Sequence, residues 1–71
     1  VHALRSWVGK DLIELNLRKK YGVNVVAIER NGVLLVNPPA DDPTQKNDVF
    51  MLLGKNNTLR KIVSAYEAEK K

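Results

Sequence analysis

The first predicted element is a helix that follows Gly9 and carries Lys10, Asp11, Glu14 and Arg18 on its polar face. Apolar residues recur there at the three- and four-residue spacings of one helix face; they are Leu12, Ile13, Leu15 and Leu17. Asn16 weakens the middle of this stretch, which predicts a short helix followed by a further turn. Gly22 ends it as a residue free to take a positive φ.

Three apolar strands follow, at residues 23–30, 33–37 and 49–53. The first two flank Asn31-Gly32, which is typical of a two-residue type I′ hairpin turn. The resulting cross-strand pairs are Arg30 with Val33, Ile28 with Leu35, and Val26 with Asn37. In the first strand Val23, Val25 and Ala27 share one face, while Asn24, Val26 and Ile28 share the other. The first and third strands are apolar on both faces, which indicates burial on both sides.

The last predicted element is a helix capped by Asn56 or Asn57. Its apolar stripe consists of Leu59, Ile62, Val63 and Tyr66. A polar tail at residues 67–71 is expected to fray, and Val1 to Ser6 reads as the end of a further strand. The predicted fold is a small α+β domain with two helices and a mostly antiparallel sheet of three or four strands. Two short helices cannot cover such a sheet, so a second copy is expected to complete a dimer.

Composition limits what this chain can be. It has 71 residues, enough for one domain over 1–71, and it begins with Val1, so we expect a fragment of a longer protein. Cys is absent, which excludes disulfides and thiolate metal sites and fits a cytoplasmic compartment. Each apolar run of the sequence, Val33 to Val36 among them, is far short of the ~18 residues of a membrane helix. No signal-peptide pattern is present, and no direct membrane insertion is expected.

Candidate catalytic and metal-binding groups are sparse. No Ser-His-Asp or Cys-His set exists, and His2 lies near the chain end, so an enzyme is not expected. Asp41 and Asp42 could suggest a cation site, but Asp in a Pro-bounded loop commonly serves turn geometry. We therefore expect no metal. The four glycines form no phosphate-binding loop.

The net charge of +4 favours an anionic partner. Nucleic acid is one candidate, because residues 18–20 and 60–61 are basic and could line a phosphate surface. Acidic residues are interleaved with these clusters, and the few aromatic residues do not sit together on strands. The favoured interpretation is that both clusters are solvated helix ends, and no nucleic-acid partner is expected.

The predicted hairpin places apolar Val26 beside the amide of Asn37. An apolar surface with hydrogen-bonding groups at its edge suits a heteroaromatic base. The alternative is that Val25 and Val26 belong to the core while Pro38 simply ends a strand. From the residues alone this alternative is favoured, because small apolar strand residues are usually buried.

Four runs of the chain together resemble the RCK C-terminal domain, also called TrkA-C. They are residues 9–18, 21–28, 37–39 and 47–54. Asn47-Asp48 stands where the family usually has Gly-Asp. The resemblance implies a non-catalytic cytoplasmic regulatory lobe whose N-terminal companion is a Rossmann-type nucleotide-binding lobe, and nothing here matches that companion.

The resemblance also implies a ligand and an assembly. In Ktr-type and cation/proton antiporter relatives this lobe dimerises and binds cyclic di-AMP at the dimer interface. The matching positions place Val25 and Val26 against the adenine, with Val36, Asn37 and Pro38 at its edge. The Arg that contacts phosphate in some relatives falls at Asn31, and the neighbouring Arg30 is expected to substitute for it.

The implied function is regulation of a bacterial potassium channel or transporter by cyclic di-AMP. The domain needs no cofactor of its own, and it would reach a membrane-embedded transport subunit through the full-length protein. One alternative is a ligand-free dimerisation module that relays the nucleotide state of the Rossmann-type lobe. A small nucleic-acid-binding domain is a weaker alternative.

Overall fold

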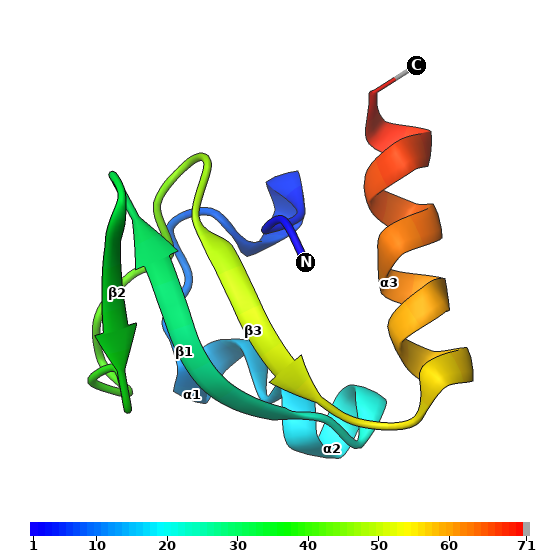
Figure 1. Ribbon diagram of the computed structural model, residues 1–71, viewed down its shortest axis with the longest axis horizontal. Helices are drawn as coiled ribbons and strands as arrows, with labels where there is room; N and C mark the ends of the chain where they lie inside the picture. The colour runs from blue at the N-terminus through cyan, green and yellow to red at the C-terminus, as the bar shows by residue number, and fades with distance from the viewer. Residues whose placement is uncertain (71) are drawn as a thin grey trace.

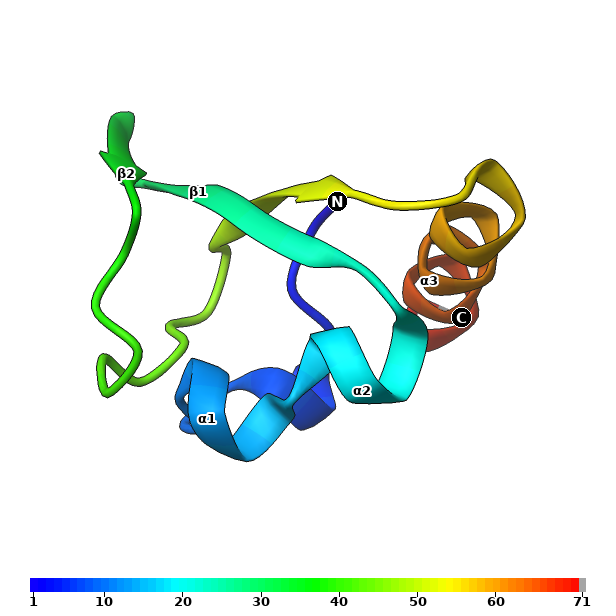
Figure 2. The same ribbon diagram turned by 90° about the horizontal axis from the view of Figure 1, so that it is seen from below.

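The domain is built around a sheet that has helices on one face and a further helix beside one edge. The computed structural model describes residues 1–70. Its elements, in chain order, are a 3-10 turn (Arg5–Trp7), α1 (Leu12–Leu15), α2 (Leu17–Tyr21), β1 (Asn24–Arg30), β2 (Val33–Val36), β3 (Val49–Leu53) and α3 (Asn56–Glu69). The antiparallel sheet has the order β2-β1-β3 (Figure 1). In Figure 2, α1 and α2 lie on one side of the sheet, and α3 lies beyond β3. The predicted α+β fold is confirmed, with three strands.

The predicted hairpin register is confirmed. Arg30 pairs with Val33 and Ile28 with Leu35. Asn31 and Gly32 both have positive φ, 53° and 78°, as a type I′ turn requires. The three strands end close to their expected limits. The hairpin pairing stops before Pro38, because Pro has no N–H to donate to a ladder.

The predicted faces of β1 are wrong at one point, because β1 carries a bulge. Along β3, Val25 pairs with Leu52 but Ala27 pairs with Met51, so Val26 is an extra residue on β1. A bulge shifts the side-chain alternation by one position. Val25 and Ile28 consequently both pack towards the core, although strict alternation places them on opposite faces.

The core lies between the sheet, α1, α2 and α3. Phe50, Val23 and Ile62 are fully buried at its centre, and the Trp7 and Phe50 ring centroids are 5.2 Å apart. The helix stripes are narrower than predicted. Ile13 is 68% exposed and Val63 is also exposed, so the sequence pattern overestimated their burial.

The first predicted helix is broken where expected. Asp11 caps α1 through a capping box with Glu14, and Asn16 adopts a left-handed conformation between α1 and α2. Gly22 then ends α2 with φ 70°. The predicted cap of the last helix is wrong: α3 begins at Asn56, its N-cap is Lys55, and no side chain caps it.

Both the N-terminal segment and the last turn of α3 are held to the rest of the fold. The N-terminal segment pairs with the free edge of β3 through a bridge between His2 and Val49. The tail predicted to fray from residue 67 is helical through Glu69, whose carboxylate accepts from the backbone N–H of Arg5 at 2.9 Å. Lys71, the last residue of that tail, lies outside the described residues. Within 1–70, no helix is both long and apolar enough to cross a membrane.

Candidate functional site

The open end of the β1–β2 hairpin brings Val26 and Asn37 together. The backbone N–H of Asn37 donates to the carbonyl oxygen of Val26 at 3.3 Å. Asn37 adopts a left-handed conformation, φ 52°, which turns the chain away from the sheet. Its side chain is exposed and makes no hydrogen bond to any other part of residues 1–70. The exposed Val26 and the unused amide of Asn37 therefore lie at the same edge.

The other residues predicted for the base contact surround this pair. Val36 precedes Asn37 and is exposed, and Pro38 follows it and is half-buried. Val25 is half-buried because it packs against the core cluster. Of the two valines, Val26 is thus the more accessible.

A hollow of about 470 Å³ lies next to this edge, beneath the start of β1. Its lining residues include Val25, Ala40, Arg18 and Asn24. The backbone N–H of Leu12 donates to the carbonyl of Ala40 at 3.1 Å, which fixes the loop that follows Pro38. The volume falls within the range of small-molecule sites.

Arg30 lies at the other end of β1 and its side chain is committed to the protein. Its Nε and one terminal nitrogen donate to the two carboxylate oxygens of Asp48, at 3.0 and 2.8 Å. The other terminal nitrogen donates to Asp42 at 2.9 Å. The Arg30 side chain is only 15% exposed. This guanidinium closes the loop between β2 and β3 onto the end of β1.

Asp48 is the most buried charged group of this network, at 1% exposure. Burial raises the pKa of its carboxyl group, but hydrogen bonds from Arg30 and the backbone N–H of Gln45 outweigh it, and the pKa lies below its usual value. The hydrogen bond to Asp48 in turn raises the pKa of Arg30. One cation therefore faces two carboxylates, and the cluster keeps a net negative charge.

Asn31 is also remote from the base-contact edge. Arg30 lies four residue steps along the strand from Val26, which is ~13 Å at the usual rise per residue. Within one chain, the structure brings together Val26, Val36, Asn37 and Pro38, with Val25 behind them. It does not bring Asn31 or Arg30 to them.

The sheet face opposite α1 and α2 is apolar and open. Leu34 and Val36 from β2 and Met51 and Leu53 from β3 are exposed on it, Leu53 at 64%. Ala27 in the central strand pairs with Val36 of β2 on one side and with Met51 of β3 on the other, so these residues form one surface. We call Leu34, Val36, Met51 and Leu53 the open sheet face.

Comparison with known proteins assigns the chain to a family. Residues 1–65 match the TrkA-C domain. The chain belongs to the TrkA-C domain family. It is 39% identical over 57 residues to the K(+)/H(+) antiporter subunit KhtT of Bacillus subtilis, covering 79% of this chain and 34% of that protein. It is 37% identical over 46 residues to the Ktr system potassium uptake protein C of the same organism, covering 65% of this chain and 21% of that protein.

Solved structures share the fold of this TrkA-C domain. The RCK C domain of the potassium transport protein KtrA, in complex with cyclic diadenosine monophosphate, superimposes with a TM-score of 0.83. The two are 25% identical, and the match covers 90% of this chain and 75% of that one. The RCK C domain of S. agalactiae BusR, also in complex with c-di-AMP, gives a TM-score of 0.78 at 21% identity, and the match covers 96% of this chain and 95% of that one. The resemblance drawn from the sequence is confirmed.

Sequence reasoning missed the Arg30 network of this TrkA-C domain. Asp42, one of the two aspartates of the polar loop, pairs its carboxylate with Arg30. No group of three or more His, Asp or Glu residues within 1–70 is placed to hold a metal ion. One feature of the sequence could have pointed to this network. Asp48 stands directly before an apolar strand, where its carboxylate is buried, and a buried carboxylate requires a cation.

Proposed function

We propose that this TrkA-C domain is a regulatory domain that binds cyclic di-AMP at a two-fold dimer interface and thereby controls potassium transport. The observation that carries the proposal is the backbone hydrogen bond between Asn37 and Val26, which brings an exposed apolar residue and a free amide to one edge. The 25% identical KtrA domain, solved with this dinucleotide, supports the choice of ligand.

The base of the ligand would use the open hairpin end. Val26 and Val36 provide apolar contacts, and the Asn37 side chain can both donate to and accept from the edge of an adenine. Pro38 stiffens the turn that presents this amide. The adjoining hollow of about 470 Å³ offers room for a ring beside Val25.

The phosphates need a cation that is not already neutralised. Arg30 is held by Asp42 and Asp48, so its predicted phosphate contact would require breaking two ion pairs. Arg18 lines the hollow next to Val25 and is exposed. We therefore assign the phosphate contact to Arg18, and Arg30 to holding the loop that begins at Asn37.

A second copy completes the proposed site. The open sheet face carries four exposed apolar side chains, and burying them stabilises an assembly by ~25 cal/mol per Å² of apolar area removed from water. A two-fold pair buries the same surface of both copies. A ligand with two identical bases matches that symmetry, because each base uses one copy of the hairpin end.

The role of the whole protein follows from its relatives. KhtT and the Ktr protein are named as a subunit of a potassium/proton antiporter and as a potassium uptake protein, and this chain matches 34% and 21% of their lengths. We propose that this domain works in the cytoplasm and acts on a membrane-embedded transport partner through the rest of its protein.

Calorimetric titration of the chain with cyclic di-AMP tests the proposal. Asn37→Gly removes the amide and keeps the left-handed backbone, since Gly takes positive φ without strain. We expect a loss of ~1–3 kcal/mol in binding free energy, the worth of a buried hydrogen bond to a polar partner. Asn47→Gly, also at a positive φ, is the matched control and should bind as the parent does. Absence of saturable binding, or equal affinity of Asn37→Gly, refutes the ligand site.

A ligand-free dimerisation module is the second candidate. It is favoured by the Arg30 network, which leaves no free guanidinium near Asn31, where some relatives have a phosphate-binding Arg. The two candidates differ in one measurement. If light scattering shows a stable dimer while calorimetry shows no cyclic di-AMP binding, the module relays a signal without a ligand of its own.

A further inference from the structure

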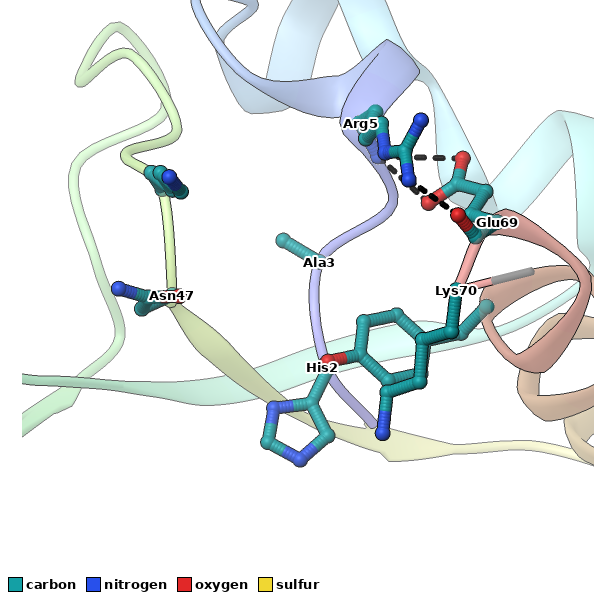
Figure 3. Close-up of a pocket in the computed structure, with 8 residues that line it drawn as sticks. His2, Ala3, Arg5, Asn47, Glu69 and Lys70 are labelled. Atoms are coloured by element: carbon teal, nitrogen blue, oxygen red, sulfur yellow. Dashed lines mark hydrogen bonds between the residues drawn. The ribbon is translucent and has the colours of Figure 1, made fainter.

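A second hollow, of about 190 Å³, lies away from the hairpin end, where three distant segments meet (Figure 3). His2, Ala3 and Arg5 come from the N-terminal segment, Lys46 and Asn47 from the turn before β3, and the remaining residues from the last turn of α3. None of the residues predicted to bind the dinucleotide lines it. It is therefore separate from the proposed base and phosphate contacts.

Positive charge dominates this hollow. Arg5, Lys46 and Lys70 line it together with His2, and Glu69 is its single carboxylate. Ion pairs between carboxylates and cationic side chains, among the residues that the structure describes, are made by Arg30 alone. The side chains of Arg5, Lys46 and Lys70 therefore make no ion pair with a carboxylate among residues 1–70, and a bound anion would relieve their mutual repulsion.

The acidic group of the hollow is already engaged. The Glu69 carboxylate accepts from the backbone N–H of Arg5 at 2.9 and 3.2 Å. The Arg5 guanidinium donates to the backbone carbonyl of Glu69, as Figure 3 shows, which covers part of the negative end of the α3 dipole. The Arg5 side chain keeps further N–H donors after this one contact.

The aromatic wall of the hollow limits the shape of a ligand. The His2 ring stacks on Tyr66 with centroids 4.9 Å apart, and the Lys70 Nζ lies 4.8 Å from the Tyr66 centroid. The ring of Tyr66 is thus already in contact with two side chains and is not an open platform for a nucleobase. The small volume and the cations together fit a compact anion.

We propose that this hollow binds the phosphate group of a small soluble molecule through Arg5, Lys46 and Lys70. The bound phosphate would join the turn before β3 to the C-terminal end of α3. The site would thus give the domain a second anionic ligand, independent of the dinucleotide and of the dimer.

Titration of the ¹⁵N-labelled chain with inorganic phosphate, followed by two-dimensional NMR, tests this proposal. The amide signals of Ala3, Arg5 and Asn47 should shift and saturate at millimolar phosphate, and sodium chloride at matched ionic strength should not reproduce the shifts. The double variant Lys46→Ala, Lys70→Ala should weaken binding about fivefold or more, as expected when charged hydrogen-bond donors are lost.

The matched control is Lys19→Ala, Lys20→Ala, which removes the same charge from the exposed side of α2. It should leave the phosphate affinity within about twofold, since charges beyond a Debye length are largely screened. Equal weakening by both double variants would attribute binding to net charge and overturn the site. Shifts that follow ionic strength in both salts would overturn it too, as would the same shifts from phosphatidylglycerol vesicles but not from free phosphate.

Discussion

Replacing Arg30 by Met should destabilise the fold strongly, because it leaves Asp48 buried without its cation. Met keeps much of the length and apolar character of the Arg stem, so the change isolates the loss of the guanidinium. Asp48 would retain one protein donor, the backbone N–H of Gln45 at 2.9 Å. The Asp42 carboxylate would also lose its partner, but it is partly exposed and water can solvate it.

The size of the effect follows from these burials. Removing one partner of a buried ion pair costs ~3–5 kcal/mol, and the Asp48 side chain is 1% exposed. The exposed contact with Asp42 adds ~1 kcal/mol at most. A chain of this size has a free energy of unfolding of about 4–10 kcal/mol. Arg30→Met should therefore lose a third or more of that stability and lower the melting temperature by ~12 °C or more.

Urea unfolding followed by Trp7 fluorescence measures this loss. Trp7 is the only tryptophan, and it is buried against Phe50, so its emission reports the core. Arg60→Met on the exposed surface of α3 is the control, expected within ~0.5 kcal/mol of the parent. A loss for Arg30→Met no larger than that of Arg60→Met would refute the role given to the network.

The pH dependence provides an independent check. Burial raises the pKa of Asp48, but the contacts with Arg30 and Gln45 hold it below its ordinary value in the parent. This contribution to stability is present above the unfolded carboxyl pKa and is lost as pH falls through the lower folded value. In Arg30→Met, burial acts without the cation and raises the pKa, so acid favours the folded variant. The stability gap between parent and variant should narrow as pH falls.

Two further predictions concern the hairpin and the open sheet face. Gly32→Val should lower the free energy of unfolding by ~1–2 kcal/mol, because a β-branched residue resists φ 78° even though the space around Gly32 is open; an unchanged melting temperature would contradict the turn. Leu53→Lys should shift a dimer towards monomer in light scattering by placing a charge in the proposed interface, whereas the exposed Ile13→Lys, on α1, should leave the assembly unchanged.

The local signals of the sequence predicted most of the fold. Asn31-Gly32 predicted both the turn and the register, because few other residue pairs accept two successive positive φ values. Asn16 likewise marked the break between α1 and α2. The bulge at Val26 could not be predicted, since nothing in the run Val25-Val26-Ala27 distinguishes an extra residue from regular alternation.

The candidate site was predicted where it depends on the hairpin and missed where it depends on tertiary contacts. Val26 and Asn37 meet because the register requires it. The ion pairs of Arg30 depend on how the loop between β2 and β3 folds back onto the sheet. The hydrophobic pattern of the sequence carries no information about that loop. Asn47 shows what a resemblance adds: it stands where the family usually has Gly, and its φ of 72° explains that preference.

The fastening of the N-terminal segment also sets an order of events during folding. The β1–β2 hairpin closes over a few residues, whereas Val1 reaches Phe50 and Arg5 reaches Glu69 across 49 and 64 positions of sequence. Loop-closure entropy makes such distant contacts the slower ones to form. We therefore expect the first residues to join β3 and α3 late in folding, so that they close the domain after the sheet has formed.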